Sequence, residues 1–263
     1  MKLKAPLVGL IESLDASETA AHLWIGLVSQ ERLPQWVDDA TLLDSRERDI
    51  ARRLTPADNR TMFLASHAAL RLVLSLYTGT EPNELRFETR HGQRPELVWS
   101  AESLPVRFSL THTSGLFAVA VTRRAACGVD AEQLSTGVLD GATLRTTLSA
   151  SELERVRPLQ SSEAVMAFHR LWTRKEAVLK AIGAGLRADP RCVSVDAEDE
   201  GASVNDPSVE LHLRTGWRVC TLLPTSDHVV SVAIRSMKEK PHLMLFELEP
   251  SLDVARIRVE PDE

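Results

Sequence analysis

The sequence has little cysteine and no long run of apolar residues. Its three cysteines, Cys127, Cys192 and Cys220, lie far apart and form no CxxC spacing. We therefore expect neither a disulfide framework nor a zinc site, and the reducing cytoplasm is the expected compartment. No apolar stretch approaches the ~18 residues of a membrane span. Acidic residues at Glu12 and Asp15 interrupt the N-terminal apolar run before a signal peptide is complete, so we expect neither secretion nor membrane insertion.

An excess of positive charge is also missing. The chain carries 31 Lys and Arg against 37 Asp and Glu, a formal net charge of −6. This balance argues against a nucleic-acid-binding surface over the whole protein, but it leaves room for a local basic pocket. With 263 residues, 43% of them hydrophobic, the chain is long enough for one large domain or two compact halves with a substantial core.

Helices and strands are expected in two similar sets, which predicts an α+β fold. Each set has a long helix followed by a cluster of strands. The first set has a strand at 22–28, a charged helix at 44–54, a helix at 56–77 that Gly79 ends, and strands between 85 and 122. The second has a helix at 162–182 and strands at 209–213, 217–222 and 229–234. The simplest architecture is therefore two similar-sized α+β halves. The predicted divisions are 1–125, 126–236 and a loosely packed extension, 237–263.

Helix signals add details to this outline. Thr55 is expected to cap the first long helix, and Ser151, with Glu154 three residues on, to cap a helix of the second set. On the first long helix, Arg60, His67 and Arg71 line one edge of the apolar stripe. These three residues are therefore candidates for a polar site beside the core.

The segment GVDAE at 128–132 places two carboxylates at the end of a strand. Asp130 and Glu132 point to the same face because side chains alternate along a strand. Two carboxylates on one face suit Mg²⁺, which takes one or two of them together with phosphate oxygens. A D-x-E pair by itself is more often two solvated acids at a strand exit than a metal site.

The segment WTRKEAVLKAIGAGL at 172–186 places Trp172, Glu176 and Lys180 along one edge of a helix. This pattern alone is compatible with an ordinary surface pair of Glu and Lys beside a half-buried tryptophan. The Gly-x-Gly after the helix is not explained in that way, because it permits a close backbone approach as well as a helix end. A carboxylate and a lysine one turn apart could serve a metal and a phosphate together.

Two shorter segments complete the set. SLTHTSG at 109–115 ends a strand with hydroxyl groups and His112, which could equally be a surface residue. GQRP at 92–95 is an ordinary turn if read alone, but the following proline would hold Arg94 as a rigid bidentate phosphate ligand.

Together, in this order, GQRP, THTSG, GVDAE and WTRKEAVLKAIGAGL resemble the motifs of the 4′-phosphopantetheinyl transferases of the larger, two-half type, which prime carrier proteins. The resemblance covers about residues 43–234, and it implies two similar α/β halves in a pseudo-two-fold arrangement with the active site at their interface. It implies transfer of 4′-phosphopantetheine from coenzyme A to a serine of an apo acyl, peptidyl or aryl carrier protein, with release of 3′,5′-adenosine diphosphate. It implies Mg²⁺ as cofactor, and a cytoplasmic monomer that binds neither nucleic acid nor a membrane.

The resemblance also assigns roles to residues. The implied Mg²⁺ ligands are Asp130, Glu132 and Glu176, and the implied catalytic residues are Glu176, Lys180 and Asp130. The implied coenzyme A ligands are Arg94, Thr111, His112, Lys175, Lys180, Arg60 and Arg71. Lys180 would contact the pyrophosphate with Lys175 close by, while His112 and Arg94 would hold the 3′-phosphate. One of Arg48, Arg52 and Arg53 would join them, and Met62 stands where the family often has an arginine.

The general base is either Glu176 or a metal-bound water, and the sequence does not choose between them. Two other functions remain open at this point. One is a coenzyme A-binding or carrier-binding module without catalysis, against which the retained carboxylates and lysines argue. The other is an Mg²⁺-dependent phosphohydrolase, in which the acids would serve a water nucleophile.

Overall fold

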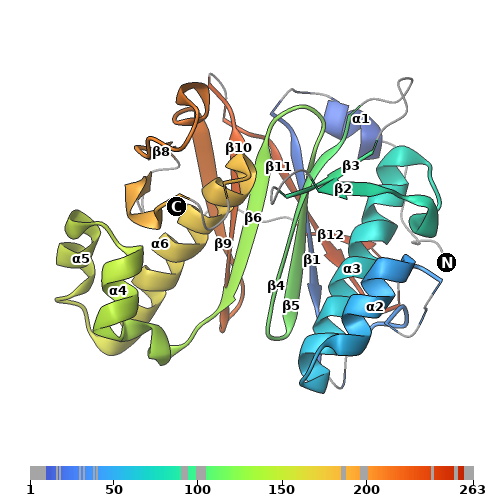
Figure 1. The fold of residues 1–263 in the computed structure, drawn as a ribbon, viewed down its shortest axis with the longest axis horizontal. Coiled ribbons are helices and arrows are strands. Elements are labelled where there is room, and N and C mark those ends of the chain that lie inside the picture. Colours follow the sequence, from blue (N-terminus) through green and yellow to red (C-terminus); the bar gives the residue numbers. More distant parts are fainter. Residues whose placement is uncertain are drawn as a thin grey trace.

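The protein has two five-stranded sheets that face each other, with helices on the outer side of each (Figure 1). The structure is a computed structural model and describes residues 10–15, 17, 19–29, 31, 33–37, 39, 41–89, 94–98, 105–184, 188–195, 201–237, 240–251 and 254–257. The α+β fold predicted from the sequence is confirmed. None of the helices in these ranges is long and apolar enough to cross a membrane.

The elements follow the chain in this order. The helices are α1 (Leu10–Asp15), α2 (Ser45–Arg53), α3 (Ala57–Thr78), α4 (Gly141–Thr147), α5 (Ala150–Val156) and α6 (Ser161–Ile182). Short 3-10 turns are η1 (Pro82–Glu84), η2 (Thr136–Leu139), η4 (Pro190–Cys192) and η5 (Leu211–Leu213). The strands are β1 (Ala21–Leu27), β2 (Phe87–Thr89), β3 (Pro95–Leu97), β4 (Arg107–Thr113), β5 (Leu116–Thr122), β6 (Cys127–Gln133), β7 (Val193–Val195), β8 (Gly201–Val204), β9 (Trp217–Thr225), β10 (His228–Arg235), β11 (Leu243–Leu248) and β12 (Val254–Ile257).

The first sheet has the order β12-β11-β1-β5-β4, so it joins both ends of the chain. Strand β11 pairs with β1 in parallel, and all other pairs in this sheet are antiparallel. Phe246 of β11 stacks on Trp24 of β1 with ring centroids 4.6 Å apart. The expectation that the C-terminal extension packs loosely is therefore wrong for β11, because Phe246 and Leu248 are buried in the core of the first half.

The second sheet has the order β6-β10-β9-β8-β7, and α6 crosses its outer face. Gly128 allows this helix to approach closely: a Cβ at that position would lie 2.0 Å from the carbonyl oxygen of Ala177. Asp130 and Glu132 follow Gly128 by two and four positions, so their side chains lie on the same face of β6. They therefore lie directly beside α6. The opposite face of β6 carries Val129 and Ala131, which pack in the apolar layer between the two sheets.

The long helices begin and end close to where the sequence predicts. Gly79 and Gly183 end α3 and α6 in the left-handed conformation. Two predicted caps are wrong. Pro56 is the N-cap of α3, without a side-chain cap, so Thr55 does not fill that role. The chain offers two overlapping S-x-x-E motifs before α5, and the structure uses Ser149 with Glu152 as the capping box.

Candidate active site

The carboxylates predicted from GVDAE and from the α6 motif lie together. Asp130 and Glu132 extend from β6, and Glu176 and Lys180 from the face of α6 that covers it. The Lys180 Nζ donates to Asp130 Oδ1 at 2.6 Å. The indole nitrogen of Trp172, one turn before Glu176, donates to Glu132 Oε1 at 3.0 Å. The spacing of the helix and the alternation of the strand thus bring these side chains together. We call Asp130, Glu132 and Glu176 the carboxylate cluster.

Asp130 is the most buried member of the carboxylate cluster, with 5% of its surface exposed. Burial raises the pKa of its carboxyl group, while the Lys180 ammonium acts in the opposite direction. Its Oδ1 accepts from Lys180 and, at 3.4 Å, from Thr111. Its Oδ2 is buried and has no hydrogen-bond partner among the described residues. A buried, unsatisfied carboxylate oxygen is costly, so this atom needs a ligand.

The pKa values of Glu176 and Glu132 are also raised. Burial raises the pKa of Glu176 to about 7, and the charges of Asp130 and Glu132 add to that effect. Burial, followed by the charge of Asp130, raises the pKa of Glu132. Each anion therefore disfavours the others, and a single ammonium group, that of Lys180, faces three carboxylates.

The residues of the carboxylate cluster fit a divalent cation in their chemistry. Hard oxygen ligands, mutual repulsion and the unsatisfied Oδ2 of Asp130 are all relieved by a cation such as Mg²⁺. Within the described part of the chain, no group of three or more His, Cys, Asp or Glu is already arranged as a metal site. The Lys180 ammonium balances part of the negative charge of the cluster through its ion pair with Asp130.

A row of hydroxyl groups on β4 joins this cluster to the first half. Ser109 Oγ accepts from the backbone N–H of Val129 at 3.1 Å, and Thr113 Oγ1 accepts from that of Gln133 at 3.2 Å. Between them, Thr111 Oγ1 accepts from the Lys180 Nζ at 3.0 Å. The three alternate residues of β4 thus hold the two halves together, and the middle one, Thr111, holds Lys180 in position.

A cavity of about 540 Å³ lies between the two halves beside Lys180. Arg46, His67 and Phe87 line it from the first half, and Lys180 and Gly183 line it from the second. Its volume is within the range of small-molecule sites, which often lie at such interfaces. We call it the interface cavity. Arg46 was not among the predicted residues, because nothing in the helix pattern separates it from the other arginines of α2.

His112 lies on the opposite face of β4 from Thr111, on the side of α3. Burial lowers the pKa of its imidazole, and the positive charges of His67 and Lys180 lower it further. His67 stacks on Phe63 and shares a hydrogen bond of 3.2 Å with Glu47. The imidazole of His112 is thus close to His67, which lines the interface cavity, and an anion beside His112 would stabilise its protonated form.

Arg94 is separated from His112. Its Nη1 donates to the carbonyl oxygen of Cys127 at 2.8 Å, and both Arg94 and Arg107 lower the pKa of the Cys127 thiol against the stronger effect of burial. Arg107 is five residues before His112 on β4, which is roughly 16 Å along a strand. Among the described residues no contact links Arg94 to His112, and a single phosphate held by both stays a prediction. Gly92 and Gln93 of the same motif lie outside the described residues, as do Gly185 and Leu186 of the α6 motif.

Lys175 is a structural residue. It is fully buried, and its Nζ pairs with Glu152 at 2.6 Å and donates to the carbonyl oxygens of Pro190 and Thr147 at 2.9 and 3.3 Å. Burial lowers its pKa, against the effect of Glu152. Five residues separate Lys175 from Lys180, which places them about 140° apart around the helix. The structure therefore contradicts the expectation that Lys175 lies beside the pyrophosphate.

Arg71 is a structural residue as well. Its guanidinium bonds Glu47 and Asp44 at 2.7 Å each, and it donates to the carbonyl oxygens of Pro82 and Leu85. It is fully buried, so the expectation that it binds coenzyme A is not supported.

The other predicted arginines do not line the interface cavity. Arg60 is exposed near the start of α3. Arg48 donates to the carbonyl oxygen of Leu43, Arg52 pairs with Asp49 at 2.6 Å, and Arg53 is exposed. Met62, at the position where the family often has an arginine, is buried in the core of the first half.

Comparison with known proteins finds similar sequences. A family model described as the 4′-phosphopantetheinyl transferase superfamily matches residues 126–233. The chain is 29% identical over 221 residues to the 4′-phosphopantetheinyl transferase HetI of Nostoc sp., covering 84% of this chain and 90% of that protein. It is 23% identical over 179 residues to a 4′-phosphopantetheinyl transferase of Bacillus subtilis, covering 68% and 74% of the two chains.

Among solved structures, a holo-(acyl-carrier-protein) synthase from Bacillus anthracis in complex with CoA (3′,5′-ADP) is similar to part of the chain. The match has a TM-score of 0.29 and 19% identity, and it covers 39% of this chain and 93% of that one.

Proposed function

We propose that this chain belongs to the 4′-phosphopantetheinyl transferase superfamily and that it transfers 4′-phosphopantetheine from coenzyme A to a serine of an apo carrier protein, with release of 3′,5′-adenosine diphosphate. The observation that carries the proposal is the carboxylate cluster with Lys180 beside the interface cavity. The names of the relatives from Nostoc and Bacillus subtilis support the same activity.

We propose Asp130, Glu132 and Glu176 as the ligands of Mg²⁺. A bound divalent cation would supply charge neutralisation for the pyrophosphate of coenzyme A. The unsatisfied Oδ2 of Asp130 supports this assignment. Lys180, held by Thr111, is the proposed partner of the pyrophosphate, where its ammonium stabilises the charge that develops on the leaving nucleotide.

Glu176 is the proposed general base for the serine hydroxyl of the carrier. Burial raises the pKa of its carboxyl group to about 7, and a bound cation would lower it again, so that the group would be ionised and able to accept a proton near neutral pH. Phosphoryl transfer otherwise depends on positioning and electrostatics, which the carboxylate cluster and Lys180 provide.

The adenosine end of coenzyme A is assigned to the rest of the interface cavity. His112, with His67 beside it, is the proposed ligand of the 3′-phosphate, and Arg46 is an additional cation on the cavity wall. Arg94 is proposed as a separate ligand at the other end of β4, where it lines the cavity next to Pro95.

The two halves have the same layer order, a long helix outside a sheet, with the sheets facing each other (Figure 1). This order supports our proposal that a pseudo-two-fold axis relates divisions 1–125 and 126–236. Cytoplasmic location and a monomeric state are likewise proposals from the sequence.

The experiment that tests the function is mass spectrometry of apo acyl and peptidyl carrier proteins incubated with the chain, Mg²⁺ and coenzyme A. A transferase adds about 340 Da to the carrier, the mass of the transferred group in this phosphoryl-transfer reaction. A phosphohydrolase would instead release phosphate or cleave coenzyme A while the carrier mass stays the same. A binding module without catalysis would leave both substrates intact, and either result would refute the proposal.

A further inference from the structure

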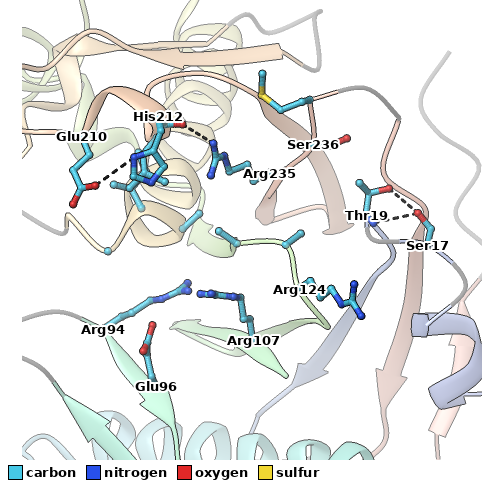
Figure 2. Close-up of a pocket in the computed structure, with 17 residues that line it drawn as sticks. Ser17, Thr19, Arg94, Glu96, Arg107, Arg124, Glu210, His212, Arg235 and Ser236 are labelled. Carbon is cyan, nitrogen blue, oxygen red and sulfur yellow. Dashed lines mark hydrogen bonds and ion pairs between the residues drawn. The ribbon is translucent and has the colours of Figure 1, made fainter. Parts of the chain in front are cut away.

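A second and larger cavity, of about 1080 Å³, opens at the end of the sheets where β5 connects to β6 (Figure 2). Its walls come from both halves: β3 and β4 on one side, the end of β10 and the 3-10 turn η5 on the other. Arg94 and Gly183 line both this cavity and the interface cavity, so the two spaces adjoin. Apart from these two residues, the polar side chains that line this second cavity lie outside the motifs that support the transferase assignment.

Positive charge is concentrated on its walls. Four arginines line it, Arg94, Arg107, Arg124 and Arg235, against two glutamates, Glu96 and Glu210. Glu210 already faces a partner, because its carboxylate lies 3.3 Å from the imidazole of His212. The cavity thus carries an excess of positive charge in a chain whose formal net charge is −6. We call this space the arginine cavity.

Hydrogen bonds to the main chain orient two of these guanidinium groups without neutralising them. Arg94 donates to the carbonyl oxygen of Cys127 at 2.8 Å, and Arg235 donates to that of His212 at 2.6 Å. The Nε of Arg235 is buried and has no hydrogen-bond partner among the described residues. An orphaned donor on a charged group is a costly arrangement unless a ligand completes it.

The guanidinium ends of Arg94 and Arg107 point toward one another on one side of the arginine cavity, and Arg235 lies on the opposite wall with its guanidinium directed toward His212 (Figure 2). Like charges held in this way repel each other, and an anion between them removes the repulsion. Ser17, Thr19 and Ser236 add hydroxyl donors to the same walls.

We propose that the arginine cavity binds a phosphorylated small molecule that carries at least two phosphate groups. The planar fork of a guanidinium matches two oxygens of a phosphate, and the arginines come from separate segments, so one ligand with two anionic groups can contact several of them. The volume is sufficient for a ligand of nucleotide size. Because the site is recessed between two halves, a small molecule fits it better than a protein surface does.

The test is titration calorimetry with inorganic pyrophosphate on the full chain and on the double variant Arg107→Gln/Arg124→Gln. Both arginines are exposed, so their replacement leaves the core intact. The matched control is Arg155→Gln/Arg157→Gln, which removes the same charge from exposed positions at the end of α5, away from the cavity. Thermal unfolding checks that the variants are folded.

We expect the Arg107/Arg124 variant to bind pyrophosphate at least tenfold more weakly, since each lost charge-assisted contact is worth about one order of magnitude or more. The control variant should bind as the parent does. Equal affinity in all three proteins would overturn the proposal, as would tighter binding of citrate than of pyrophosphate. Loss of all pyrophosphate binding in Lys180→Met would show that the interface cavity alone is the site. The titration contains no carrier protein, so its outcome is independent of whether the chain is a transferase.

Discussion

The raised pKa of Glu176 leads us to predict that the free energy of unfolding depends on pH. The carboxyl group has a pKa of about 7 in the folded protein against an ordinary value of 4.5, because burial and the charge of Asp130 disfavour its anion. Between these two pH values the native state holds a proton that the unfolded state releases. The stabilisation is therefore complete below about pH 4.5 and is lost as the pH rises through 7.

The size of this effect follows from the two pKa values. Their difference corresponds to about 3 kcal/mol at high pH. Integrated over pH, about 1 kcal/mol is already lost at about pH 5.5 and about 3 kcal/mol at about pH 8.5. Glu176→Gln removes the titrating group but keeps its shape. Relative to the parent, the variant should therefore gain about 2 kcal/mol of unfolding free energy between those two pH values.

Urea denaturation at both pH values, in buffer with a chelator, measures this difference. Glu163→Gln, on the exposed first turn of the same helix, is the matched control and should show no comparable gain. Mg²⁺ added at the higher pH should stabilise the parent more than Glu176→Gln. The reasoning fails if Glu176→Gln is less stable than the parent at the higher pH, or if its advantage does not depend on pH.

Three further changes separate structural residues from ligands. Lys175→Met should destabilise the protein by about 3–5 kcal/mol in urea denaturation, because it leaves Glu152 buried without its partner; a loss of activity in a protein of normal stability would contradict this role. Gly128→Ala should prevent α6 from packing on β6, since the new Cβ meets the main chain of Ala177, and normal thermal unfolding would refute the close approach. His112→Ala should reduce the preference for coenzyme A over dephospho-coenzyme A by roughly tenfold, mainly through KM; equal loss on both donors would show that His112 does not hold the 3′-phosphate.

Local periodicity was enough to predict which side chains of the carboxylate cluster share a face of their strand or helix. Alternation along a strand put Asp130 and Glu132 on one face, and spacing along a helix put Glu176 and Lys180 on one edge. What periodicity does not contain is the pairing of distant segments. The bond from Lys180 to Thr111 joins residues 69 positions apart in the chain.

The wrong predictions for the α5 cap and for Lys175 also have their cause in contacts between distant segments. Ser151 with Glu154 is as good a capping box in sequence as Ser149 with Glu152, but Glu152 is selected because its carboxylate is buried against Lys175. This contact also explains why Lys175 is a structural residue. The angle of about 140° between positions 175 and 180 could have been worked out from the helix repeat alone.

Arg71 and β11 show the limits set by tertiary structure. The helix pattern placed Arg71 at the edge of an apolar stripe. Its guanidinium pairs with the carboxylates of Glu47, in α2, and of Asp44, the N-cap of α2, and the pattern of α3 alone does not specify these partners. Strand β11 pairs in parallel with β1, which is more than 200 residues earlier, and a pattern within 243–248 does not specify that partner.

The most direct test of the central claim is the rate of phosphopantetheine transfer by Asp130→Asn at saturating Mg²⁺ and coenzyme A. Asparagine keeps the shape of Asp130 but removes the charge that faces Lys180 and the proposed cation. We predict a loss of at least about a hundredfold in kcat, about 3 kcal/mol in the activation barrier, in a protein that still unfolds cooperatively. A kcat within a few-fold of the parent, in that same folded variant, would contradict the assignment of the carboxylate cluster as the catalytic centre.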